Sequence, residues 1–101
     1  MKIYTVDEIK EISVPIAKAY GVKKLALFGS YARGEAREWS DIDFVIDKGS
    51  SEKLRGLDYF GFILDLEDAM KIDVDVITYD SLKKSPIAYA IEDEVVLYEH
   101  E

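Results

Sequence analysis

Two aspartates separated by a single residue, Asp41 and Asp43, follow a Gly29-Ser30 pair after a spacer of ten residues. Residues 41–46 form an apolar segment of strand length that starts Asp-Ile-Asp. Because strand side chains alternate between faces, a strand here places both carboxylates on one face. Neighbouring carboxylates repel each other unless a hard divalent cation such as Mg²⁺ neutralises them. The spacing therefore predicts a magnesium site on this strand.

Gly29 and Ser30 come directly after an apolar run of strand length, Leu25–Phe28. Glycine permits an unusual backbone conformation and close approach of a ligand, and the amides and hydroxyl that follow can donate to phosphate oxygens. Ser30 could instead simply cap a turn. Arg33 is the nearest cation to this phosphate site and suits bidentate capture of phosphate oxygens, although it could also pair with Glu35 or Asp41.

A third acid comes from residues 71–78, a second alternating segment in which Asp73 and Asp75 share one face. If this strand pairs beside residues 41–46, three carboxylates converge. That arrangement suits a two-metal site, in which one ion activates an attacking oxygen and both stabilise in-line displacement at phosphorus. In a chain this acidic, the same residues could also form only a solvated strand face.

Trp39, the only tryptophan in the sequence, lies in the predicted loop just before Asp41. It could stack on a nucleotide base, or it could plug the loop onto the body of the protein.

The remaining pattern predicts an α/β fold, or α+β if antiparallel pairing dominates, with about four strands in a small mixed sheet and helices packed on one side. A capping box at Thr5 and Glu8 begins the first helix, Pro15 should kink or break it near Val14, and Gly21 ends it. The other expected elements are strands over residues 23–28 and 95–98, a long helix over 54–71, one turn over 81–84 and a short helix from Ser85-Pro86 to Asp93.

The long helix has more apolar surface than one sheet requires. Its main stripe should cover the sheet, and Leu57, Phe60 and Leu64 form a second patch on another side. That patch predicts either an interface with another chain or cover from the N-terminal helix or the last helix.

At 101 residues the chain is expected to be a single domain, 1–101. Its net charge of −8 disfavours direct nucleic-acid binding, because that affinity rests on clustered Lys and Arg. Cysteine is absent, and the one histidine, His100, is poorly placed for a Ser-His-Asp hydrolase. Without a long apolar run or a signal-peptide pattern, the chain is expected to be cytoplasmic with no membrane association.

The segments Phe28–Ala36 and Ser40–Asp43 resemble the nucleotidyltransferase superfamily typified by DNA polymerase beta. They are most similar to the minimal nucleotidyltransferases, short proteins often encoded beside a HEPN-domain toxin. The resemblance covers nearly the whole chain. By position, Asp75 matches the third acid of the family better than Asp73 does.

This resemblance implies a polymerase-beta-like nucleotidyltransferase fold and an enzyme that transfers AMP from ATP to a hydroxyl. Asp41, Asp43 and Asp75 would hold two Mg²⁺ ions, and Gly29 and Ser30 would fix the β- and γ-phosphates. The implied acceptor is a tyrosine on a HEPN ribonuclease toxin, which makes the chain a type VII-like antitoxin that forms homo- or hetero-oligomers. Two alternatives stay open: a non-catalytic antitoxin that occludes its partner, and a small-molecule nucleotidyltransferase of the aminoglycoside-modifying type.

Overall fold

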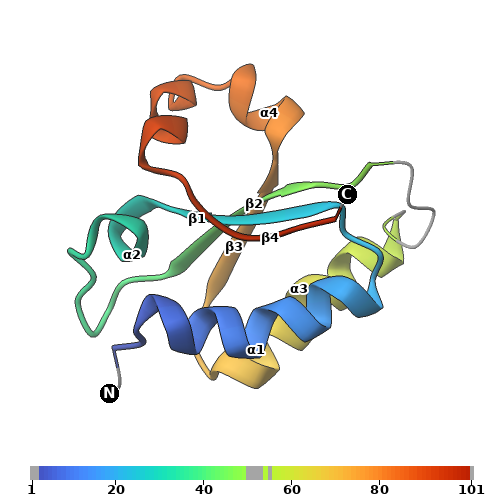
Figure 1. The fold of residues 1–101 in the computed structure, drawn as a ribbon, viewed down its shortest axis with the longest axis horizontal. Helices are drawn as coiled ribbons and strands as arrows, with labels where there is room; N and C mark the ends of the chain where they lie inside the picture. The colour runs from blue at the N-terminus through green and yellow to red at the C-terminus, as the bar shows by residue number, and fades with distance from the viewer. Residues whose placement is uncertain (1–2, 50–53, 55, 101) are drawn as a thin grey trace.

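The computed structural model describes residues 3–49, 54 and 56–100. A four-stranded sheet lies at its centre, with the long helices α1 and α3 against one face and α4 on the other side (Figure 1). The elements in chain order are α1 Val6–Ala19, β1 Lys24–Phe28, α2 Gly29–Arg33, β2 Ile42–Asp47, α3 Leu57–Met70, β3 Val74–Thr78, α4 Tyr79–Lys83, the 3₁₀ helix η2 Ala88–Asp93 and β4 Val95–Glu99. This mixed architecture confirms the predicted fold class.

The sheet brings the two acid-bearing segments together. Its strand order is β3-β2-β1-β4, with β1 antiparallel to both β2 and β4, and β2 parallel to β3. Parallel pairing requires a crossover, which α3 supplies. Consequently three consecutive strands carry the residues that the sequence singled out: β1 leads into Gly29, β2 carries Asp43 and β3 carries Asp75.

Helix α1 begins as its sequence predicts. The Thr5 hydroxyl accepts a hydrogen bond from the Glu8 amide at 3.1 Å, and the Glu8 carboxylate accepts one from the Thr5 amide at 3.0 Å. The predicted break near Val14 is wrong, because the helix runs without interruption through Pro15 to Ala19. Pro15 lies on the exposed side of α1, where water can satisfy the carbonyl left without an amide donor.

Both faces of the sheet are packed, and they are packed unequally. The main core lies between the sheet and helices α1 and α3; its large buried members include Ile9, Leu25, Phe44, Phe62 and Leu66. A smaller cluster on the other face joins Ala26, Phe28 and Val45 of the sheet to Leu82 of α4 and Ala90 of η2. Asp43 and Asp75 share this second face with Val45 and Ile77, so they lie on the more open side of the sheet.

Helix α3 starts at Leu57, later than predicted, and Arg55 lies outside the described residues. Phe62, Leu66 and Met70 are buried against the core. Leu57, Phe60 and Leu64 are 86%, 64% and 61% exposed, so the described part of the chain does not cover this second apolar patch. The alternative in which another helix of the chain covers it is therefore wrong.

The segment before β4 differs from its predicted form. Helical structure begins at Ala88 and is a 3₁₀ helix, whereas the proline pattern predicted a helix from Ser85. The Ile87 amide donates to the Ser85 hydroxyl at 3.1 Å, so Ser85 caps a turn that precedes the helix. Among the described residues, the helices are too short or too polar to cross a membrane.

Candidate active site

The junction between β1 and α2 lies directly against Asp43. Phe28, the last residue of β1, is the register partner of Asp43 in β2. Gly29 follows with a φ of +73°, a left-handed conformation that favours glycine. A Cβ atom placed on Gly29 would lie 2.4 Å from Oδ2 of Asp43, well inside van der Waals contact. The glycine is therefore required twice, for its backbone angle and for the space that the carboxylate fills.

Asp43 and Asp75 are register partners across the parallel β2–β3 pair. Burial raises the pKa of Asp43 to about 6, and the negative charges of Asp75 and Asp41 together with a hydrogen bond to Asp75 add to this rise. Asp43 is half-buried, whereas Asp75 is exposed. The two carboxyl groups are thus held together at a cost that a proton or a cation relieves.

Asp41 immediately precedes β2. The predicted strand began at Asp41, whereas the observed strand begins one residue later, at Ile42. Its side chain is exposed, and its charge reaches Asp43. Within residues 3–49, 54 and 56–100, no three acidic or histidine side chains are arranged to hold one ion between them. The predicted two-metal centre therefore stays a prediction, supported here by the contact between Asp43 and Asp75.

The sheet register distinguishes Asp75 from Asp73. The carbonyl of Asp73 accepts a hydrogen bond from the Ile42 amide at 3.2 Å, so Asp73 lies beside the start of β2, just before β3 begins. Asp75 is paired with Asp43 itself. This geometry favours Asp75 as the third acid, in agreement with its position in the sequence motif.

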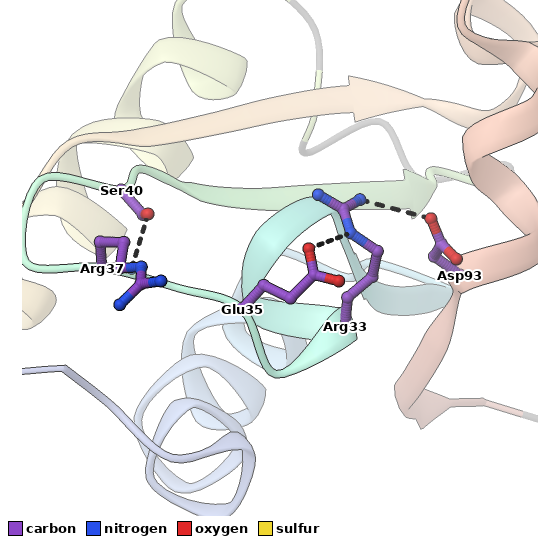
Figure 2. A network of polar contacts seen from close by, with 5 residues as sticks. All are labelled: Arg33, Glu35, Arg37, Ser40 and Asp93. Atoms are coloured by element: carbon purple, nitrogen blue, oxygen red, sulfur yellow. Dashed lines mark hydrogen bonds and ion pairs between the residues drawn. The ribbon is translucent and has the colours of Figure 1, made fainter.

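Arg33, at the end of α2, forms two ion pairs (Figure 2). Its Nε lies 3.3 Å from Oε2 of Glu35, and its Nη1 lies 3.3 Å from Oδ2 of Asp93 in η2. The first partner was predicted as an alternative, and pairing with Asp41 was not found among the described contacts. The charge of Arg33 also lowers the pKa of Asp43, opposing the rise caused by burial. Arg33 therefore lies where its field reaches the acids.

Asp93 is a residue of this neighbourhood that the sequence does not reveal. It stands 60 positions after Arg33, in a segment without a recognisable motif. Only the folding of η2 across the second face of the sheet brings it to Arg33.

Ser30 and Trp39 complete the set of predicted residues. Ser30 is the second residue of α2 and partly buried, so it does not act as the cap of that helix. Trp39 is 79% exposed, which makes the interpretation as a plug wrong.

A polar cavity of about 600 Å³ lies at the other end of the sheet. Lys24, Asp47 and Tyr79 line it. Lys24 and Asp47 are register partners of β1 and β2, four positions along each strand from the register partners Phe28 and Asp43. The cavity contains none of the predicted site residues. The acids lie on an open surface, which suits a site that receives a large acceptor.

A strand, a glycine turn and acids on two adjacent strands define the class of nucleotidyltransferases. The model of the nucleotidyltransferase domain matches residues 6–98, and this chain belongs to that family. The sequence-based prediction of a nucleotidyltransferase enzyme is thereby confirmed.

Several archaeal relatives have similar lengths. The chain is 35% identical over 100 residues to the protein adenylyltransferase MntA of Thermococcus cleftensis, an alignment covering 95% of this chain and 98% of that protein. It is 42% identical over 77 residues to a Methanocaldococcus jannaschii protein provisionally named as a protein adenylyltransferase, covering 76% of this chain and 81% of the relative.

Solved structures have the same fold. One, provisionally described as a minimal nucleotidyltransferase, is 28% identical with a TM-score of 0.69, covering 85% of this chain and 86% of the other. A toxin-antitoxin structure with AMP-PNP has a TM-score of 0.70 at 18% identity, covering 91% and 74% of the two chains. A Shewanella oneidensis complex of a tri-AMPylated HEPN toxin with its MNT antitoxin has a TM-score of 0.61 at 15% identity, covering 90% and 70%.

Proposed function

We propose that this chain transfers AMP from ATP to a tyrosine hydroxyl of a HEPN-domain ribonuclease, and that it acts as the antitoxin of that protein. The observation that carries the proposal is the contact of Gly29, Asp43 and Asp75 across three adjacent strands. The proposal is further supported by relatives named as protein adenylyltransferases and by structural neighbours that are toxin–antitoxin complexes.

The acids are suited to hold Mg²⁺. Asp43 and Asp75 supply hard oxygen ligands. Burial, with the nearby negative charges of Asp75 and Asp41, raises the pKa of Asp43, so a bound cation would stabilise its charged form. Asp41 is exposed beside them and can add its carboxylate. Two Mg²⁺ ions bound there would neutralise the triphosphate and stabilise the charge that develops at phosphorus.

The chain's own residues then have separate tasks. Gly29 and Ser30 position the β- and γ-phosphates at the start of α2, and Arg33 contributes positive charge at the edge of the site. Asp75 orients the acceptor hydroxyl and takes up its proton. The hydroxyl oxygen forms a bond to the α-phosphorus, the bond between that phosphorus and the bridging oxygen breaks, and pyrophosphate leaves.

The test is incubation of the chain with Mg²⁺ and a purified HEPN-domain protein, using ATP labelled at either the α- or the γ-phosphate. Label from the α-position should enter the HEPN protein, and mass spectrometry should locate AMP on a tyrosine. No label should arrive from the γ-position. The Asp43→Asn variant serves as the inactive control.

Other outcomes separate the alternatives left open by the sequence. Inhibition of the ribonuclease without label, equal in wild type and Asp43→Asn, would indicate antitoxin action by occlusion. Label found on an aminoglycoside but on no protein would indicate a small-molecule enzyme. Either result would contradict the proposed transfer to tyrosine.

A further inference from the structure

Trp39 is presented to solvent by a turn that is closed from both ends. The Ser40 amide donates to the Arg37 carbonyl at 3.0 Å, and the Arg37 amide donates to the Ser40 hydroxyl at 2.9 Å (Figure 2). Glu38 and Trp39 occupy the two central positions of this turn. The indole, 79% exposed, is therefore held outward by a hydrogen-bonded loop.

The same turn lies beside the candidate active site. Asp41 follows Trp39 by two residues, so their Cα atoms are at most about 7 Å apart. Asp41 and Asp75 are both exposed, which leaves the acids open to an incoming acceptor. A protein–protein interface of standard size covers about 800 Å² of each partner, a patch with a radius of roughly 16 Å. An acceptor interface of that size centred on these carboxylates therefore extends past the position of Trp39 in the chain.

A nucleotide base is a poorer match for this indole. Small-molecule sites are concave and bury most of their ligand, commonly about 70–90% of its surface. A side chain that is 79% exposed on a turn forms no wall of such a site, and the polar cavity at the far end of the sheet does not include it. A flat, exposed aromatic residue is suited instead to a protein surface, where tryptophan is enriched among the residues that contribute most to affinity.

We propose that Trp39 is the docking residue for the acceptor protein, an inference that rests on the proposed function. The indole inserts into an apolar hollow beside the acceptor tyrosine. Residues 34–41 carry three acids, Glu35, Glu38 and Asp41, against the single cation Arg37. The rim of the acceptor hollow is accordingly basic, because opposite charges favour association and like charges exclude it.

Steady-state AMP transfer to a HEPN-domain protein tests this docking role in Trp39→Ala and Trp39→Phe. We expect Trp39→Ala to raise the KM for the HEPN protein by on the order of tenfold or more, with the KM for ATP changed by less than about twofold. Trp39→Phe should recover part of the loss. Val96→Ala, which truncates an exposed apolar side chain on β4 at the opposite edge of the sheet, should behave like wild type.

Because Trp39 is the only tryptophan, a chain labelled with 5-fluorotryptophan reports docking directly by ¹⁹F NMR, independently of catalysis. The single resonance should shift on addition of the HEPN protein and stay in place on addition of ATP and Mg²⁺ alone. A shift with ATP alone, together with a raised KM for ATP in Trp39→Ala, would identify a base-stacking residue and overturn the proposal. A resonance unmoved by the HEPN protein would also overturn it. Absence of AMP transfer by wild type would contradict the proposed function separately, while the ¹⁹F shift would still decide whether Trp39 docks the partner.

Discussion

Asp43 fills the space in which any residue other than glycine at position 29 would place its side chain. A Cβ atom there would lie 2.4 Å from Oδ2 and 3.3 Å from Cγ of Asp43. The turn after β1 and the acid on β2 are therefore a single packed unit, and a change in one displaces the other.

Gly29→Ala should consequently lose AMP transfer by on the order of 100-fold, because a misplacement of a catalytic group by about 1 Å has that effect. Gly34→Ala is the matched control: Gly34 has a φ of +74°, nearly the same as Gly29, with no atom within 4 Å of its added Cβ. Both variants should lose about 1 kcal/mol of stability from the left-handed backbone, measured by denaturant unfolding. Equal activity of the two variants would show that the contact with Asp43 does not matter.

The raised pKa of Asp43 predicts how the stability of the metal-free protein depends on pH. The group has a pKa of about 6 when folded and about 3.8 as its ordinary value, so between these values the folded state binds more protons than the unfolded state. Stability should therefore fall as the pH rises from about 4 to about 7. Asp43→Asn removes this titration, so its gain in Tm over wild type should be larger near pH 7 than near pH 4.

Thermal melts in the presence of a chelator measure this difference, with Asp80→Asn, an exposed acid of α4, as the control. A Tm difference for Asp43→Asn that is the same at both pH values would contradict the assignment. In the wild type, added Mg²⁺ should raise the Tm near neutral pH.

The register of β2 and β3 predicts which acid of residues 73–75 is catalytic. Asp75→Asn should lower kcat by roughly 100-fold or more, as expected for loss of a group that handles the acceptor proton. Asp73→Asn should retain most of the activity, because Asp73 lies beside Ile42 and not beside Asp43. If the effects of the two substitutions were exchanged, the assignment would be wrong by one pleat of the strand.

The exposed patch of α3, formed by Leu57, Phe60 and Leu64, predicts a surface that binds another chain. Phe60→Asp should leave the Tm nearly unchanged while reducing association with a partner or with a second copy, as measured by sedimentation. Phe62→Ala, two residues away and fully buried, should cost about 3–5 kcal/mol and lower the Tm by several degrees per kcal/mol. Global unfolding of Phe60→Asp would remove the case for an interface here.

The sequence was sufficient to predict those elements whose causes are local. The capping box at Thr5, the strand patterns and the Gly29 turn all depend on residues within a few positions of one another. The second partner of Arg33, Asp93, was not predictable, because it reaches Arg33 only through long-range packing of η2. The exposure of Trp39 was also not predictable, since an aromatic residue in a loop is compatible with the sequence whether it is packed against the protein or presented on a turn.

In the part of the chain that the structure describes, strand β3 has a neighbour on one side only, and that neighbour is β2. A ligand bridging Asp43 and Asp75 would fasten the outer strand of the sheet to its interior, across a crossover that runs through α3. Loading of the site should then slow hydrogen–deuterium exchange at the amides of Val74–Thr78, while β4, the opposite edge, keeps its rate. Until the site is loaded, the edge strand that carries Asp75 is held to the sheet by its pairing with β2 alone.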